Sequence, residues 1–234
     1  MSPGREHKDS WTVRVREAGV AALPPEKLLP DSQPTYVASW IYVFGVATLA
    51  SLLVIIGSGM VLSLKGPAWW HDTGIGHFIN SIHLWSVELF FATMVIHLWG
   101  KYWMAAWRGG RRAVWVTGAI TFLVAVPTAF TGYLSQQNFD AQWIATQAKD
   151  GINSVGAGAF FNVLNFGQMY SYHVLLFPLA VVGLGVAHVL LVRRHGVVPP
   201  FVLKSGSHTE EGEDERKPLP APPDEPSVPA GAAR

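Results

Sequence analysis

The sequence predicts an all-α membrane protein, built as a bundle of four transmembrane helices. About half of its 234 residues are apolar and only 14% are charged, which is a low charge content for a soluble domain of this size. Four stretches are long and apolar enough to cross a bilayer, which takes about 20 such residues. Histidines recur at matching positions in two of these stretches. The net charge of +1 is nearly balanced, so no nucleic-acid partner is expected.

The predicted spans contain almost no ionisable side chains. Only the second carries an acid, Glu88, and none carries Lys or Arg. An α-helix pairs its own backbone groups, so it is the expected element for crossing lipid. In chain order the predicted spans cover residues 36–64, 74–100, 113–133 and 170–192.

Lysine and arginine are distributed unevenly around these spans. Five precede the first span, four lie between the second and third, and two directly follow the fourth, whereas the other two connections carry one lysine each. By the positive-inside rule, both termini face the cytoplasm of a multi-pass plasma-membrane protein. The first 36 residues contain no short apolar core, so no cleavable signal peptide is expected.

The chain divides into three predicted parts. Residues 1–35 form a cytoplasmic arm, which is either a short amphipathic helix on the membrane surface or disordered. Residues 36–200 form the four-helix domain, and 135–168 within it is too long for a tight turn, so it should have structure of its own on the outer face. Residues 201–234 are rich in Pro, Gly, Glu and Ser and are predicted to be a disordered cytoplasmic tail.

Two histidine pairs carry the functional prediction. His83 and His97 are 14 residues apart in the second span, and His173 and His188 are 15 apart in the fourth. At 100° per residue, each pair returns to within about 40–60° of one face, with its members roughly 21–22 Å apart along the helix. Two parallel spans of this kind predict two stacked bis-imidazole sites, His83 with His173 near the outer side and His97 with His188 near the cytoplasmic side. The alternative is four separate histidines, each hydrogen-bonded to neighbouring polar groups.

Paired neutral imidazoles suit the iron of a low-spin haem that transfers electrons and has no open coordination position. The chain contains no cysteine, which excludes iron–sulfur ligation, thiolate metal sites and covalent haem attachment. The sequence therefore predicts two non-covalent b-type haems, with the four histidines as axial iron ligands.

Glycines repeat the same spacing in the other two spans. Gly45 and Gly59 are 14 residues apart in the first span, as are Gly118 and Gly132 in the third. Glycine is a poor helix former, so spaced pairs call for a packing reason. We predict that they leave room at the two depths where the haems bind; ordinary close helix packing through small residues is the alternative.

These residues carry a resemblance to a known family. Over roughly residues 36–200 the chain resembles the N-terminal, haem-binding half of cytochrome b, and its 15-residue histidine step is similar to that of the split cytochrome b6 type. The matching motifs are 81–86 (SIHLWS), 115–118 (WVTG), 131–133 (TGY), 170–173 (YSYH) and 192–196 (VRRHG).

The resemblance implies a low-potential outer haem and a higher-potential inner haem in a quinol-oxidising respiratory complex of the bc/b6f kind. In such a complex the chain passes electrons across the membrane but is not catalytically complete alone. The implied partners are quinol and quinone, an iron–sulfur or other redox protein, and a separate three-helix subunit that supplies the second half of cytochrome b.

The chain departs from the family pattern at three places, and the first of them, the altered segment after Tyr133, favours an alternative function. The Pro-Trp-Asp-Gln run that follows the third helix in the family is absent from residues 134–140 (LSQQNFD), and Asn80 replaces an arginine that pairs with a haem propionate. Val43 replaces the cysteine that attaches an extra haem in photosynthetic members, so no covalent haem is expected. The alternative is a di-haem membrane anchor that exchanges electrons between the quinone pool and a different redox enzyme, without bifurcation.

Several polar residues have open roles. Arg111 and Arg193 either bind haem propionates or a quinone headgroup, because guanidinium binds carboxylate in a fork, or only set the topology. Glu88 lies about 140° around its helix from His83 and either relays protons or bonds to a partner helix. Weaker predictions are quinol contacts for Asp140 and Gln142, and surface positions for His71 and His77.

Overall fold

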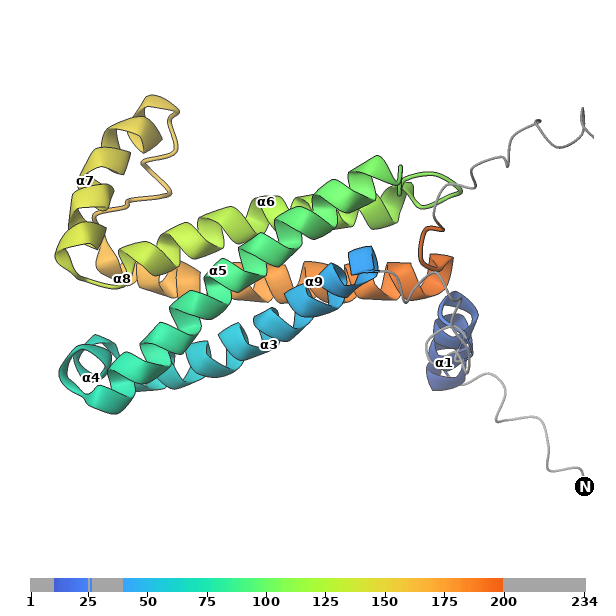
Figure 1. Ribbon diagram of the computed structural model, residues 1–234, viewed down its shortest axis with the longest axis horizontal. Coiled ribbons are helices and arrows are strands. Elements are labelled where there is room, and N and C mark those ends of the chain that lie inside the picture. Colours follow the sequence, from blue (N-terminus) through green and yellow to red (C-terminus); the bar gives the residue numbers. More distant parts are fainter. Residues whose placement is uncertain (1–10, 25, 27–39, 200–234) are drawn as a thin grey trace, which may run out of the picture. The chain divides into compact units, whose positions relative to one another are not determined.

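The computed structural model describes residues 11–24, 26 and 40–199. The predicted tail 201–234 lies outside the described residues. Within them, every regular element is helical, which confirms the predicted all-α fold (Figure 1). In chain order the elements are α1 (Trp11–Ala22), α3 (Trp40–Lys65), α4 (Pro67–Asp72), α5 (Gly74–Trp103), α6 (Arg112–Leu134), α7 (Phe139–Ser154), α8 (Phe166–Ser171), the π-helical turn η2 (Tyr172–Leu176) and α9 (Phe177–His195).

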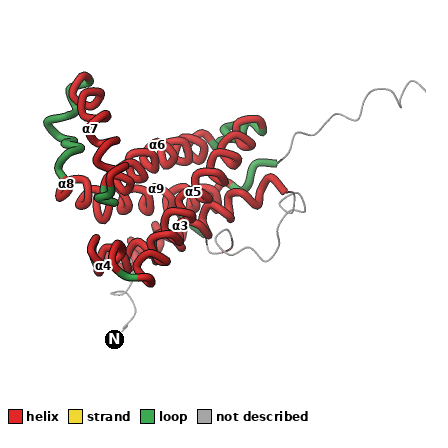
Figure 2. Tube along the Cα trace, turned by 60° about the vertical axis from the view of Figure 1, so that its left-hand side comes forward, coloured by secondary structure: helices red, strands yellow, loops and turns green. Residues whose placement is uncertain are grey.

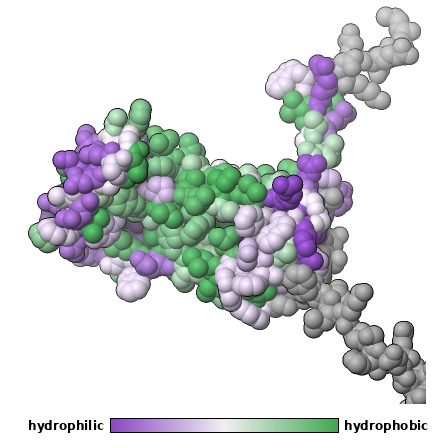
Figure 3. Space-filling model, turned by 90° about the horizontal axis from the view of Figure 1, so that it is seen from above, coloured by the Kyte–Doolittle hydropathy of each residue, from purple (hydrophilic) through white to green (hydrophobic). Residues whose placement is uncertain are grey.

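Four of these helices are long and apolar enough to cross a membrane, which confirms the four predicted spans. They are α3, α5, α6 and the continuous run α8–η2–α9, which covers Phe166–His195. Large apolar side chains lie exposed along their outer surfaces, for example Leu53, Leu123 and Leu179, each more than 60% exposed. Figure 3 shows apolar residues gathered over the middle of the bundle. This is the surface that a lipid-facing bundle requires, because lipid rather than water surrounds it.

The four spans pack as two pairs. α3 packs along α5, and α6 packs along α9 (Figures 1 and 2). The pairs meet at mid-height in an apolar cluster formed by Phe90 and Met94 of α5, Ala125 of α6 and Val181 of α9. Leu52 and Ile55 of α3 pack against this cluster, so all four spans contribute to it.

Polar side chains and glycines define where the helices begin and end. Gly66 has a positive φ of 80° and separates α3 from α4. The Thr73 hydroxyl accepts a hydrogen bond from the Gly76 N–H at 3.0 Å and so caps α5. Asn138 caps α7 in the same way, accepting from the Ala141 N–H at 2.8 Å. These caps fix the short connections that join the spans.

The segment between the third and fourth spans forms structure of its own, as predicted. It contains α7 and leads into α8, and it packs through a second apolar cluster made by Leu134, Ala145, Val163 and Met169. Met169 is fully buried. This cluster anchors the segment to the ends of α6 and the fourth span.

Residues Trp11–Ala22 form the helix α1, where the sequence left a surface helix and a disordered arm as alternatives. None of its side chains is buried. Its location on a membrane surface stays a prediction.

Candidate functional site

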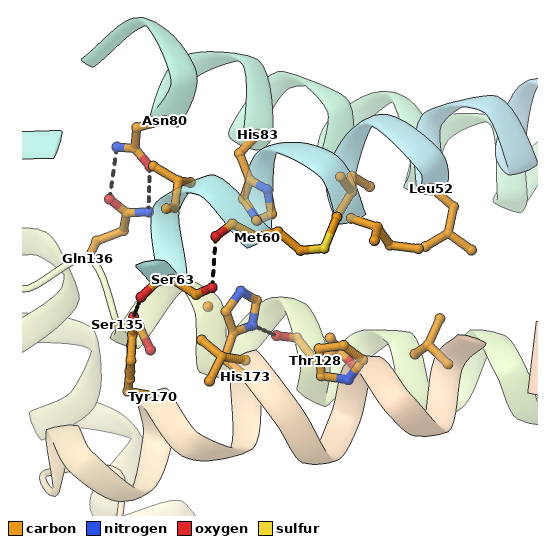
Figure 4. A pocket seen from close by; sticks show the side chains of 18 of the residues that line it. Leu52, Met60, Ser63, Asn80, His83, Thr128, Ser135, Gln136, Tyr170 and His173 are labelled. Carbon is orange, nitrogen blue, oxygen red and sulfur yellow. Dashed lines mark hydrogen bonds between the residues drawn. The ribbon is translucent and has the colours of Figure 1, made fainter. Parts of the chain in front are cut away.

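Two histidines face each other between the helix pairs. His83 projects from α5 and His173 from η2, with ring centroids 6.1 Å apart and ring planes at 89° (Figure 4). His83 is only 7% exposed. We refer to the depth of His83 and His173 as the outer level, and to that of His97 and His188 as the inner level.

The separation at the outer level fits one metal ion shared by two imidazoles. A first-row metal lies about 2 Å from an imidazole nitrogen, so two bonds plus the distances from nitrogen to ring centre place the centroids roughly 6 Å apart. The perpendicular, T-shaped arrangement also occurs between rings in direct contact, so the support for a shared metal comes from the centroid distance. The residues present therefore fit the bis-imidazole site that the sequence predicted.

Hydrogen bonds orient three of the four imidazoles. His173 Nδ1 lies 2.8 Å from the Thr128 carbonyl, and His188 Nδ1 lies 2.9 Å from the Val114 carbonyl. A carbonyl only accepts, so each of these Nδ1 atoms carries the hydrogen and each Nε2 keeps its lone pair. This is the tautomer that can bind a metal through Nε2.

A hydroxyl group, that of Ser58, sets the same tautomer in His83. Its Nδ1 lies 3.0 Å from Ser58 Oγ, and Ser58 donates its single hydrogen to the Val54 carbonyl at 2.6 Å. The Ser58 oxygen therefore accepts from His83 Nδ1, which again leaves Nε2 free.

Each of the four predicted glycines contacts one of the four histidines. A Cβ added at Gly132 would overlap the His173 ring, and Cβ atoms at the other three would lie 3.0–3.1 Å from the Cε1 atom of a histidine. The contacts run within the helix pairs, so the glycines of α3 face α5 and those of α6 face the fourth span. The matched pairs are Gly45 with His97, Gly59 with His83, Gly118 with His188 and Gly132 with His173.

A π-helical turn carries His173. The Phe177 N–H bonds to the Tyr172 carbonyl, five residues back instead of four, so η2 holds one more residue than an α-helical turn. Pro178 explains the wider turn, because proline has no N–H to donate and its ring displaces the carbonyl four residues earlier, that of Val174. The extra residue absorbs the difference between the 15-residue step of the fourth span and the 14-residue step of α5.

The inner level differs from the outer level in its charge. Lys101 lies four residues after His97, one turn further along the same face of α5. The Lys101 ammonium lies 3.8 Å from the centre of the Tyr42 ring, while the Tyr42 hydroxyl donates to the Val198 carbonyl at 2.8 Å. A cation is therefore fixed beside the inner histidines.

The sequence matches the family model described as "Cytochrome b(N-terminal)/b6/petB" over residues 88–218, which is more than half of the chain. The chain belongs to the cytochrome b N-terminal/b6 family. This confirms the resemblance on which the sequence prediction relied. Family membership and the four apolar spans make the chain a multi-pass membrane cytochrome of the b type.

Curated relatives and a solved structure share this cytochrome fold. The menaquinol:cytochrome c reductase cytochrome b subunit of Geobacillus thermodenitrificans is 24% identical, covering 70% of this chain and 84% of the relative. Cytochrome b6 of Oltmannsiellopsis viridis is 32% identical, covering 56% of this chain and 66% of the relative. A chain of a structure titled "Hyperthermophilic respiratory Complex III" aligns with a TM-score of 0.62 and 22% identity, covering 83% of this chain and 57% of that chain. The cytochrome therefore spans just under two thirds of the b6 relative and little more than half of the solved chain.

A cavity of about 190 Å³ surrounds the outer histidines of this b-type cytochrome. At one end, Asn80 of α5 and Gln136, which follows α6, exchange two amide hydrogen bonds of 3.1 Å each (Figure 4). Asn80 is the position at which the resemblance implied an arginine, and the structure has an amide pair there. None of the residues described as lining this cavity is charged.

The arginines predicted for a binding role lie at the inner end. Arg111 donates from Nε to the Gly196 carbonyl at 3.2 Å, which ties the connection before α6 to the end of α9. Arg193 lies exposed in the last turn of α9. A haem or quinone contact for either residue stays a prediction. Glu88 is exposed on α5 and does not line the outer cavity, as its angle from His83 predicted.

The weaker predictions fall outside the cavity. Asp140 and Gln142 are exposed at the start of α7, and neither lines the outer cavity. His71 and His77 are exposed, as expected for surface histidines, and His71 Nε2 donates to the Gln136 carbonyl at 2.6 Å.

The sequence analysis missed three kinds of residue. It did not identify the acceptors that orient the imidazoles, because carbonyls such as that of Thr128 leave no mark on side-chain patterns. It also missed Lys101 and the cavity residue Trp70. For Lys101 a signal was present, since it lies four residues after His97 and so shares its helix face.

Proposed function

We propose that this chain transfers electrons across the membrane through two b-type haems. His83 and His173 hold one, and His97 and His188 hold the other. The observation that carries the proposal is the opposed pair of outer imidazoles, 6.1 Å apart and perpendicular. The contact of each histidine with a glycine supports the same assignment for the inner pair.

The residues prepare each site for a metal before it binds. Ser58 and two backbone carbonyls accept from Nδ1 of His83, His173 and His188, so the Nε2 atoms of these three histidines keep their lone pairs. Nδ1 of His97 is buried without a partner among the described residues. A haem b held by two such histidines would supply a one-electron couple. With two protein ligands, the site would favour electron transfer over oxygen binding.

Apolar packing separates the two levels. The cluster around Phe90, Met94, Ala125 and Val181 lies between them, since Phe90 is seven residues from both His83 and His97. Close-packed side chains exclude water from the middle of the bundle. Charge therefore crosses this region as an electron and not as an ion.

The relatives suggest the setting for this electron transfer. One is named a subunit of a menaquinol:cytochrome c reductase, and another is named cytochrome b6. We propose that the chain is the cytochrome b subunit of a quinol-oxidising complex in the plasma membrane, with both termini cytoplasmic. A separate three-helix subunit supplies the second half of cytochrome b, and an iron–sulfur protein accepts electrons. No haem is attached covalently, because the chain has no cysteine.

One feature favours the second candidate, a di-haem anchor that serves another redox enzyme without bifurcation. The segment after α6 lacks the family's Pro-Trp-Asp-Gln run, and Gln136 bonds instead to Asn80. Purification of the complex from its native membranes separates the two. An iron–sulfur partner supports the quinol-oxidising complex, whereas a different oxidoreductase supports the anchor.

Haem content tests the central proposal. The purified chain should contain two b-type haems by the pyridine haemochrome assay, which titrate as two separate potentials. His173→Ala should remove one haem signal and His188→Ala the other, while the exposed His77→Ala should keep both. A wild-type chain with a single haem, or a His173→Ala variant with two, would contradict the proposal.

A further inference from the structure

An acidic side chain lies exposed halfway along a membrane span. α5 runs from Gly74 to Trp103, and Glu88 is 14 residues from the first and 15 from the last. At 1.5 Å per residue it lies roughly 21–22 Å from either end, which is the middle of a hydrocarbon core about 30 Å thick. Its side chain is exposed on the surface of the bundle. Acids within membrane spans are costly to expose to lipid and almost always have a partner.

The described part of the chain does not supply this partner. No described residue forms a hydrogen bond or an ion pair with Glu88. Every Lys and Arg of the four spans lies in a terminal turn. Lys101 is the nearest of them along α5, but it is 13 residues and so roughly 20 Å away, and it lies over the Tyr42 ring.

Glu88 belongs to a continuous exposed row on α5, which we call the α5 seam. Its members follow one another by alternate steps of four and three residues, and they are Ser81, Trp85, Glu88, Ala92, Val95 and Trp99. A repeat of 3.5 residues is the spacing along which two helices pack. At 100° per residue, all six lie within about 60° of the direction opposite His83. The seam therefore faces away from the histidines, which favours a contact with a partner helix over a proton relay to the haems.

The side chains next to Glu88 suit a second helix. Trp85 is 75% exposed and lies roughly 4.5 Å from Glu88 along the axis, within the hydrocarbon core. Tryptophan gathers at the two membrane interfaces, so a largely exposed indole at this depth is a further sign of a missing neighbour. Ala92, one turn beyond Glu88, is small and lets another backbone approach closely.

We infer that a transmembrane helix of another subunit packs along the α5 seam and places a Lys or Arg side chain against Glu88. The inference rests on the part of the proposed function that gives this chain a partner membrane subunit, and it does not depend on the haems. It assigns the partner to one face of one helix and states the charge that the partner brings.

A cation fits this position better than the other possible occupants. It neutralises the carboxylate and donates to it, and a charge-assisted hydrogen bond is about twice as strong as a neutral one. A second copy of the chain packed on the same seam would bring a second Glu88 to the first, because a two-fold axis places like residues together. Two carboxylates at one place repel each other.

A photo-crosslinking side chain tests the position of the partner. Benzoylphenylalanine replaces Trp85, an aromatic residue of similar size, in the full chain in its native membranes. The control is the same replacement at Leu123, which is 65% exposed and lies midway along α6. The probe at 85 should crosslink to a membrane helix of another subunit, with a Lys or Arg within about two helical turns of the crosslinked residue by mass spectrometry. The probe at 123 should not reach that helix.

Removal of the acid tests the charge. Glu88→Ala leaves the partner's cation unpaired, so the amount of that subunit retained in the purified complex should fall by roughly tenfold or more. Leu123→Ala is the matched control at the same depth and should retain it. Replacing the partner's Lys or Arg by Leu should restore retention in the Glu88→Ala complex, because no charge is then left unpaired. Both haem signals should survive in all of these variants.

Crosslinks from position 85 to lipid alone, to a second copy of the chain, or to a helix without a nearby Lys or Arg would overturn the inference. Equal retention of the subunit in Glu88→Ala and Leu123→Ala would overturn it as well. A wild-type chain without two b-type haems would instead defeat the proposed electron transfer, since the crosslink and the retention assay do not require haem.

Discussion

The hydrogen bond made by Nδ1, the nitrogen that would not bind iron, sets how strongly each histidine donates electrons to iron through Nε2. An acceptor at Nδ1 pulls on its hydrogen and makes the imidazole a stronger donor through Nε2, which favours ferric iron. At His173 and His188 the acceptors are backbone carbonyls, which substitution cannot remove. At His83 the acceptor is the side chain of Ser58, so this contact can be tested directly.

Ser58→Ala should raise the midpoint potential of the outer haem. Loss of the acceptor weakens the imidazole as a donor and so destabilises the ferric state. One hydrogen bond of about 0.5–1.5 kcal/mol corresponds to roughly 20–60 mV for one electron. Redox titration measures the shift. Ser51→Ala is the matched control, because Ser51 is buried on the same helix and, within the described part of the chain, its hydroxyl bonds to the Ala47 carbonyl alone. Equal shifts in both variants would contradict a specific role for Ser58.

Gly132 is the glycine with the least room. Gly132→Ala should largely remove the outer haem signal, because the new Cβ overlaps the His173 ring and turns it away from His83. Gly183→Ala in α9 has nothing within 4 Å of its Cβ and should keep both haems. The reduced-minus-oxidised spectrum compares them. An outer haem that survives Gly132→Ala with an unchanged midpoint potential would show that the glycine is not needed for the site.

At the scale of elements, the π-helical turn aligns the fourth span with α5. In a regular α-helix, each residue rotates the next side chain by 100°. A regular helix with a 15-residue step would therefore point His188 about 100° away from where a 14-residue step would point it. With the extra residue held in η2, both spans present their histidines at matching angles.

Deleting one residue from η2 should therefore be tolerated. Removal of Leu175, combined with Pro178→Ala so that the turn can close as an α-helix, makes His173 and His188 14 residues apart and keeps their alignment. Removal of Gly185, in the regular part of α9, leaves η2 intact and rotates His188 by about 100°. We expect two haem signals after the first deletion and loss of the inner signal after the second, as measured by redox titration. The same outcome for both deletions would contradict the role given to η2.

The sequence predicted the elements well because its signals are local. Apolar runs and histidine spacing depend on few residues and on the fixed rise of a helix, so the four spans and the facing of His83 toward His173 followed from them. The π-turn was missed because 100° per residue assumes a regular helix. The contact of Trp70 with the cavity was missed for another reason, since it depends on how α4 folds back against α5.

At the scale of the whole molecule, charge is distributed unequally between the two levels. Lys101 lies one helical turn beyond His97 at the inner level, whereas no charged residue is described among those lining the outer cavity. A nearby cation stabilises the ferrous state, which carries one positive charge less, and so raises the midpoint potential. The protein thereby gives a physical reason for the low-potential outer haem and higher-potential inner haem that the resemblance implies, and the difference favours electron flow inward.

Lys101→Met should reduce this difference. Methionine keeps the length of the side chain and its contact with the Tyr42 ring but removes the ammonium, so the inner midpoint potential should fall. A loss of about 1 kcal/mol of attraction corresponds to roughly 40 mV for one electron, and the outer potential should stay the same. Lys65→Met is the control, because Lys65 ends α3 near Trp69 and does not line the outer cavity. If Lys101→Met leaves the inner potential unchanged, the difference between the haems must come from another source, such as the partner subunits or the protein dipoles around each pair of histidines.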